Sequence, residues 1–262
     1  MGKREGYETG SADETEGRKV KNREESRNWR EIVASLQRLV RDEGDLGRRM
    51  KILADALLGR PYVTSPLIGG PDEPERVVID LCGFDCVTFV ETVLSLARSR
   101  THLGFAAELV SARYRGGEVS YAKRLHYFSD WMKQNERRGA IRIRTRGAGA
   151  RSLPVTLDLL AAFPPRRVSL TVVPRRSLAL AADRIGAGAI AAFATVRARL
   201  DFFHTGLLFP GPPARRPEDS LVLYHAARSR GRVVAEPLGD FLRRNRMRGI
   251  AFANPQDRGE TT

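Results

Sequence analysis

The stretch Gly83-Phe84-Asp85-Cys86-Val87-Thr88-Phe89-Val90-Glu91 predicts the start of a buried helix with a cysteine in its first turn. Asp85 has the side chain of an N-cap, which accepts hydrogen bonds from the unpaired N–H groups of that turn. Apolar residues then follow the helical period at Val87, Phe89, Val90, Val93, Leu94 and Ala97. A thiol placed here faces the positive end of the helix dipole, which favours the nucleophilic thiolate. A small side chain in a core helix explains the same pattern equally well.

Two histidines lie on predicted strands far downstream of this cysteine. His204 stands near the start of the apolar run Phe203–Phe209, and His225 lies within Leu221–Ala226. A thiol nucleophile needs a base within hydrogen-bond reach, and the base needs a third polar group to orient it. The set predicts a cysteine hydrolase in which Cys86 attacks, His204 is the base and His225 orients the base. Asp201 is the alternative orienting residue, and each histidine taken singly is also consistent with a structural role.

Two more segments turn this order into a resemblance to a known family. Gly59-Arg60-Pro61-Tyr62-Val63 precedes the cysteine, where NlpC-type enzymes carry a Pro-Tyr motif, and Tyr121-Ala122-Lys123-Arg124-Leu125-His126-Tyr127-Phe128-Ser129-Asp130-Trp131 follows it. From about Leu46 to Phe252 the chain resembles the bacterial N-acetylmuramoyl-L-alanine amidase-like family of the NlpC-type papain-like cysteine hydrolases. The resemblance implies a papain-like α+β fold. It also implies hydrolysis of the amide between N-acetylmuramic acid and L-alanine in peptidoglycan fragments (muropeptides).

The resemblance also suggests which residues contact the substrate. Tyr62 is expected to line the site, with Asp85 and Tyr127 as further substrate-binding residues. Arg124 and His126 are expected to project together from a helix over residues 121–134. There the planar fork of arginine suits bidentate contact with a substrate carboxylate. Packing and a surface ion pair are the alternative for these two side chains.

No metal or organic cofactor is implied. Cys82 and Cys86, with two distant histidines, raise the possibility of a zinc site, which ranks below a nucleophile because no short metal-type spacing occurs elsewhere.

The order of predicted elements indicates an α+β domain. Residues 1–28 are highly charged and are predicted to be disordered, residues 29–254 to form one domain, and residues 255–262 to be a flexible tail. Helices are expected early, over residues 29–40, 46–57, 86–97, 105–114 and 121–134, with a short strand at 77–79. An antiparallel sheet is expected later, from strands at 168–173, 189–195, 203–209, 221–226 and 250–252, with helices at 178–183 and 238–246.

Charge and hydropathy limit the class of protein. The formal net charge is +14. Three explanations of this positive charge are ranked. Solvated surface charge comes first, and binding of an anionic substrate such as a muropeptide comes second. Binding of nucleic acid comes third, and nucleic acid is not an expected partner. No apolar run reaches the ~20 residues that span a bilayer, and no signal peptide is recognised near the start. The second observation conflicts with the periplasmic or extracellular location that the resemblance suggests. Three alternative functions remain. The protein could cut another stem-peptide bond, of the γ-D-glutamyl type, it could bind nucleic acid, or it could be an inactive scaffold.

Overall fold

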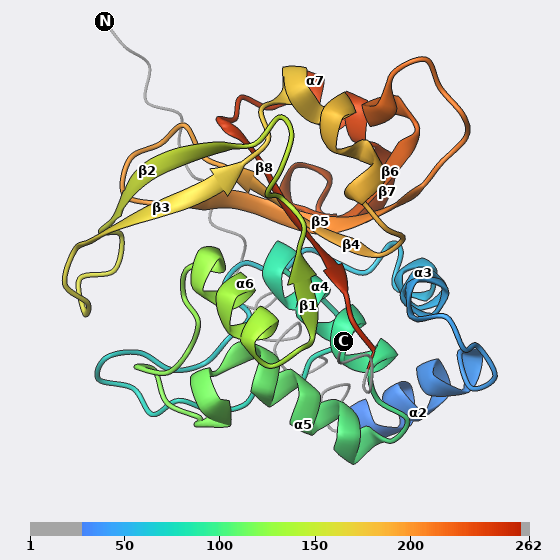
Figure 1. The fold of residues 1–262 in the computed structure, drawn as a ribbon. Helices are drawn as coiled ribbons and strands as arrows, with labels where there is room; N and C mark the ends of the chain where they lie inside the picture. Colours follow the sequence, from blue (N-terminus) through green and yellow to red (C-terminus); the bar gives the residue numbers. More distant parts are fainter. Residues whose placement is uncertain (1–27, 258–262) are drawn as a thin grey trace, which may run out of the picture.

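The computed structural model describes residues 28–257, so the predicted disorder of residues 1–28 lies almost wholly outside the described residues. The described part is a mixed α+β domain in which helices come first and an antiparallel sheet follows (Figure 1). The first helices are α2 (Trp29–Leu39), α3 (Leu46–Ala56), α4 (Cys86–Ala97), α5 (His102–Arg113) and α6 (Phe128–Arg137). The fold class expected from the sequence is therefore confirmed at this level.

A six-stranded antiparallel sheet has the strand order β1-β8-β4-β5-β6-β7. Its strands are β1 (Ile141–Ile143), β4 (Ala189–Ala194), β5 (Phe202–Pro210), β6 (Leu221–Ala227), β7 (Arg232–Pro237) and β8 (Gly249–Pro255). A separate hairpin consists of β2 (Arg151–Leu157) and β3 (Arg166–Val172). Every residue of the central strand β4 is buried, which explains its continuous apolar sequence.

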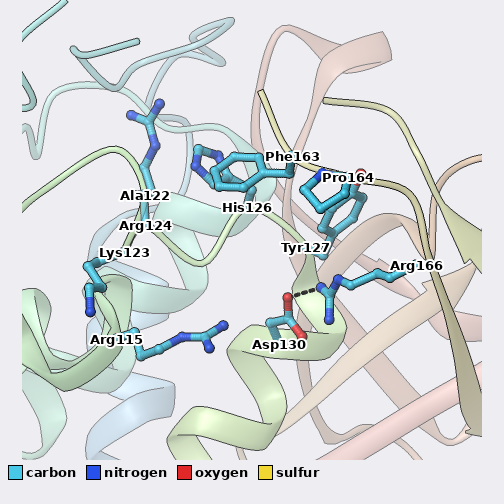
Figure 2. Close-up of a pocket in the computed structure, with 10 residues that line it drawn as sticks. All are labelled: Arg115, Ala122, Lys123, Arg124, His126, Tyr127, Asp130, Phe163, Pro164 and Arg166. Atoms are coloured by element: carbon cyan, nitrogen blue, oxygen red, sulfur yellow. Dashed lines mark hydrogen bonds and ion pairs between the residues drawn. The ribbon is translucent and has the colours of Figure 1, made fainter. Parts of the chain in front are cut away.

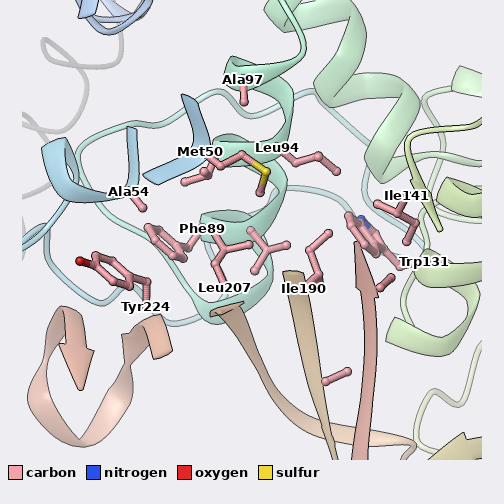
Figure 3. Packing of buried hydrophobic residues seen from close by; sticks show 14 of the residues in the cluster. Met50, Ala54, Phe89, Leu94, Ala97, Trp131, Ile141, Ile190, Leu207 and Tyr224 are labelled. Carbon is pink, nitrogen blue, oxygen red and sulfur yellow. The ribbon is translucent and has the colours of Figure 1, made fainter. Parts of the chain in front are cut away.

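The sheet separates two hydrophobic cores. Helices α2 to α6 gather on one face, where the side chains of Met50, Phe89, Leu94, Trp131 and Leu207 pack together (Figures 1 and 3). On the other face lies α7 (Leu238–Arg244), whose Phe241 packs on Phe193 of β4 with ring centroids 4.5 Å apart. Short 3₁₀ helices complete the chain at η1 (Arg115–Gly117), η2 (Arg175–Arg184), η3 (Pro217–Asp219) and η4 (Arg228–Arg230).

Several expected elements differ from the structure. Residues 77–79 form no strand, because the backbone pairing nearby is an isolated bridge between Ile68 and Arg76. The helix expected over residues 121–134 begins only at Phe128. The segment before it is a turn: the backbone N–H of Arg124 donates to the Ser120 carbonyl, and the neighbouring backbone pairs with that of Arg113 and Tyr114. At the end of the chain, β8 runs to Pro255, Gln256 donates its backbone N–H to Ala140, and Asp257 pairs with Arg49.

Candidate active site

Cys86 is the first residue of α4, where its backbone is held by a capping box. The Asp85 carboxylate accepts the backbone N–H of Thr88 at 2.8 Å and that of Val87 at 3.1 Å. In return, the Thr88 hydroxyl accepts the backbone N–H of Asp85 at 3.0 Å. Reciprocal bonds of this kind satisfy donors that a helix start leaves unpaired. The Asp85 side chain, expected to contact substrate, is thus occupied in positioning the cysteine.

The sheet brings His204 and His225 into direct contact. Nε2 of His204 lies 2.6 Å from Nδ1 of His225, and the two rings are nearly perpendicular at 84°. In β5, the register with β4 shifts so that Phe193 faces His204 while Ala194 faces Phe202. This irregularity leaves Phe203 as an extra residue, and such bulges redirect neighbouring side chains. The pairing of the two histidines expected from the sequence is present.

A carboxylate and an arginine extend this contact along the sheet edge. Nε2 of His225 lies 3.0 Å from Oε1 of Glu236 on β7, and the other oxygen of Glu236 pairs with Arg244 of α7. Because a carboxylate only accepts, the Nε2–H of His225 is the donor, and neutral His225 must then accept at Nδ1 from the Nε2–H of His204. His204 is left with its lone pair on Nδ1. The series Glu236, His225, His204 thus selects the tautomer in which His204 is a base.

Gly206 allows the two histidine strands to approach so closely. A Cβ atom at this position would lie 2.7 Å from both Leu223 Cδ1 and the Tyr224 carbonyl oxygen, and 3.0 Å from Cβ of His225. Backbone atoms cannot move aside without opening the β5–β6 pairing. The glycine of the His-Thr-Gly sequence is therefore part of the geometry that joins His204 to His225.

The Cys86 thiol lies against the strand that carries His204. The backbone N–H of Thr205, the next residue after His204, favours the thiolate, as do the N–H groups of Cys86 and Val87. Burial of the thiol and the negative charge of Asp85 outweigh these groups and raise the pKa of Cys86 to about 12. The helix start therefore favours the thiolate as expected, but desolvation and the Asp85 charge penalise the charged form more strongly.

Both histidines are also neutral at ordinary pH. Burial, followed by the nearby His225, lowers the pKa of His204 to about 3. Burial, followed by Arg244, lowers the pKa of His225 to about 4. Aromatic rings account for the dry surroundings, since Phe241 lies 5.3 Å from the His204 ring and 5.4 Å from the His225 ring. At rest, the Cys86 thiol is thus protonated and the His204 imidazole, on the strand that the thiol lies against, is neutral.

Tyr62, which the Pro-Tyr motif predicted to line the site, lies close to the start of α4. Its backbone bridges Phe84, two residues before Cys86, and its N–H donates to Gly231 at 2.8 Å. Burial, and then the nearby Cys86 and Asp85, raise the pKa of the Tyr62 phenol. A cavity of about 330 Å³ adjoins it, lined by Pro61, Tyr62, Val63, Thr64, Asp80, Cys82 and Gly83.

Asp201, the alternative orienting residue, is engaged elsewhere. Its carboxylate accepts the backbone N–H of Ser129 at 2.7 Å and that of Phe202 at 2.7 Å. These bonds tie the start of β5 to the start of α6. The hydrogen-bond partner of the His204 ring is His225 and not Asp201.

The remaining expected site residues lie in a second region, around the turn before α6. The Arg124 guanidinium donates to Glu75 at 3.1 Å and to the Gly69 carbonyl at 3.1 Å, so its fork holds the 69–75 loop. His126 bonds the Tyr121 carbonyl at 2.7 Å, and the Tyr127 hydroxyl accepts the Leu159 N–H at 2.9 Å. All three still line a cavity of about 380 Å³, described below.

Within residues 28–257, no group of three or more His, Cys, Asp or Glu side chains is placed to hold a metal ion. In the same part of the chain, the helices are too short or too polar to cross a bilayer.

The chain is similar in sequence and fold to proteins described as amidases. A family model described as AmiA-like, N-acetylmuramoyl-L-alanine amidase-like, matches residues 52–250. No curated protein matches the sequence. Among solved structures, an N-acetylmuramoyl-L-alanine amidase from Bacteroides uniformis ATCC 8492 superposes with a TM-score of 0.71 at 27% identity, covering 82% of this chain and 100% of that one.

Two other solved structures support the fold. A protein of Legionella pneumophila str. Philadelphia 1, assigned to the family DUF1460, has a TM-score of 0.72 at 20% identity and covers 91% of this chain and 97% of its own. A structure from Bacteroides fragilis described as a putative xylanase has a TM-score of 0.60 at 24% identity, covering 77% of this chain and 98% of its own. At these identities the likeness concerns the fold alone.

Proposed function

Because this chain belongs to the N-acetylmuramoyl-L-alanine amidase-like family, which acts on amide bonds of peptidoglycan, we propose that it is a cysteine amidase with a papain-like, NlpC-type site. The bond cleaved joins the lactyl carbonyl of N-acetylmuramic acid to the amine of L-alanine. The observation that carries the proposal is the hydrogen-bonded series Glu236, His225, His204, which ends on a strand whose next residue, Thr205, has its backbone N–H at the Cys86 thiol.

The reaction begins with proton transfer and attack in one step. Because both groups are neutral at rest, His204 takes the thiol proton on Nδ1 as the sulfur of Cys86 bonds to the amide carbon. The carbonyl oxygen becomes an oxyanion, and the backbone N–H of Cys86 is one donor available to it. His225 and Glu236 hold the new imidazolium, because its Nε2–H already points along their series of hydrogen bonds.

The intermediate then collapses with loss of the stem peptide. His204 gives its proton to the leaving nitrogen, so the peptide departs with a free amine and a muramoyl thioester remains on Cys86. Water, deprotonated by His204, attacks the thioester carbon, and the muramoyl carboxylate and the thiol are restored. Atoms and charge balance over the cycle, and the residues named require no cofactor.

The direct test is the mass of the products. Purified protein is incubated with an N-acetylmuramoyl peptide, and the products are identified by mass spectrometry. We expect N-acetylmuramic acid and the intact stem peptide, and no product from Cys86→Ala. Cleavage within the stem at a γ-D-glutamyl bond would instead make the protein an endopeptidase. Full activity of Cys86→Ala would overturn the role of the thiol.

A further inference from the structure

The second cavity, of about 380 Å³, lies apart from the thiol and histidines (Figure 2). Three segments enclose it: residues 115–126, the start of α6, and the loop that joins β2 to β3. Most of its lining is charged or aromatic. The lining residues are Arg115, Ala122, Lys123, Arg124, His126, Tyr127, Asp130, Phe163, Pro164 and Arg166. The reaction steps above use none of these residues.

The charged side of this cavity is basic. Four cationic side chains line it against one carboxylate, that of Asp130. Arg166 pairs with Asp130 and lies over the ring of Tyr127, 5.5 Å from its centroid. Arg115 extends toward that pair in Figure 2, and within residues 28–257 its guanidinium makes no hydrogen bond or ion pair. Arg115 and Arg166 are therefore the cations placed to accept an incoming anion.

The opposite side is an aromatic wall. Phe163 stacks on Tyr121 with centroids 5.8 Å apart and lies 5.1 Å from the His126 ring. A cavity with cations on one side and rings on the other suits a carboxylate carried on an aliphatic chain, because the chain can pack on the rings while the carboxylate meets arginine.

The start of α6, which lines the cavity, is hydrogen-bonded to the start of the strand that carries His204. Ser129, next to Asp130, donates its backbone N–H to Asp201 at 2.7 Å, and Asp201 precedes His204 by three residues. Three residues of extended strand span about 10 Å. A four-residue stem peptide spans about 14 Å when extended. A substrate with its scissile amide at Cys86 can therefore place a stem carboxylate near this cavity.

We propose that this cavity binds a carboxylate of the stem peptide, with Arg115 and Arg166 as its cationic ligands. The inference rests on the proposed function, because it takes the ligand to be part of the amidase substrate. Asp130 competes with the ligand for Arg166, so its removal should strengthen binding. Arg124, whose fork is held by Glu75 and Gly69, shapes the cavity without taking the carboxylate.

Steady-state kinetics with two substrates tests the assignment. One is an N-acetylmuramoyl peptide with free stem carboxylates, and the other is the same peptide with those carboxylates amidated. For the free acid, Arg115→Gln and Arg166→Gln should each raise KM roughly tenfold with kcat within about twofold, since a charge-assisted hydrogen bond is lost. Asp130→Asn should lower KM. For the amidated peptide all three KM values should stay within about twofold of the parent.

Arg137→Gln is the matched control, because Arg137 is exposed on α6, the helix that carries Asp130, and does not line the cavity. It should change neither KM. Equal KM values for the free acid in Arg115→Gln, Arg166→Gln and the parent would overturn the cavity's role while leaving the chemistry at Cys86 intact. The opposite shifts expected for Arg166→Gln and Asp130→Asn separate ligand binding from a general loss of structure.

Calorimetry separates failure of this inference from failure of the proposed function. The probe is the free tetrapeptide L-alanyl-γ-D-glutamyl-diaminopimelyl-D-alanine, titrated into Cys86→Ala protein. Binding that weakens roughly tenfold with Arg115→Gln supports the cavity even if no muropeptide is hydrolysed. Hydrolysis by the parent, together with tetrapeptide binding indifferent to Arg115→Gln, overturns the cavity alone.

Discussion

Replacement of Asp85 by asparagine should lower the pKa of the Cys86 thiol. Burial of the thiol disfavours the thiolate most, and the charge of the Asp85 carboxylate comes second. Together, burial and Asp85 raise the pKa of Cys86 to about 12. A like charge at close range shifts a pKa by roughly 1–3 units. For half-buried Asp85 we take the lower end, about one unit, which corresponds to about 1.4 kcal/mol. Asparagine still caps the helix, so the cost to stability should be below about 1 kcal/mol.

The assay is the rate of alkylation by iodoacetamide between about pH 7 and pH 10, in Cys82→Ala protein so that Cys86 is the remaining cysteine. Since the thiolate reacts, the parent rate should rise about tenfold per pH unit without a plateau, and that of Asp85→Asn should be about tenfold higher at each pH. Asp45→Asn, at the N-cap of α3, removes the same charge from a helix without a thiol and should change nothing. An unchanged rate in Asp85→Asn, or a parent rate that levels off below about pH 8, would refute the reasoning.

Four further predictions concern the histidines and the core. Gly206→Ala should reduce kcat at least about tenfold, because the new methyl group forces β6 away and separates the two imidazoles. Glu236→Ala should reduce kcat roughly 10- to 100-fold, the effect of losing a charge-assisted hydrogen bond worth about 1.5–3 kcal/mol, while KM changes little. With the pKa of His204 lowered to about 3 and that of Cys86 raised to about 12, kcat/KM should be flat from about pH 5 to pH 9. Glu91→Gln should destabilise the fold by roughly 3–5 kcal/mol in urea unfolding, because it leaves buried Arg113 without its carboxylate.

Matched variants distinguish these effects from general damage. Gly44→Ala adds a methyl group where nothing lies within 4 Å and should be silent. Asp240→Ala, the control for Glu236→Ala, removes an exposed carboxylate from α7. Glu118→Gln, the control for Glu91→Gln, breaks an exposed ion pair with Lys123 that is worth about 1 kcal/mol or less. If Glu236→Ala were as active as Asp240→Ala, the role of Glu236 in orienting His225 would be refuted. An acid limb of kcat/KM centred near pH 6.5 would contradict the desolvated state of His204.

The two histidines also make stability depend on pH. Their pKa values are lowered in the folded protein, so the unfolded chain binds more protons as pH falls below about 6.5. Their contribution to stability is therefore fully present above that pH and is lost progressively as pH falls toward the folded values of about 4 and about 3. A histidine stabilised by an ion pair has a raised pKa, and its contribution to stability is instead lost as pH rises.

Local signals in the sequence predicted the parts of the site that local structure builds. The capping residue Asp85, the apolar period after Cys86 and the two histidine strands all follow from neighbouring residues, and each is present. The pairing of His204 with His225 followed from a chain order shared with a known family. Sequence could not show the raised pKa of Cys86, because burial by distant strands decides it.

The parts that sequence missed depend on tertiary contacts. Glu236 lies on β7, a short edge strand rich in exposed residues, and its role appears only when β7 pairs with β6 and places it against His225. Arg124 and His126 were expected on a helix, because apolar residues around them follow its period. The turn forms instead because Arg124 bonds Glu75 and Gly69, which no local pattern records.

The identity of a covalent intermediate tests the central claim most directly. Cys82→Ala protein is mixed with an N-acetylmuramoyl peptide, quenched in acid during turnover, and its intact mass and fragments are measured. We predict a muramoyl acyl group, without the stem peptide, on Cys86, and no adduct on Cys86→Ala. An adduct that carries stem-peptide residues, or turnover that persists in Cys86→Ala with no adduct, would contradict cleavage of the muramoyl amide by this thiol.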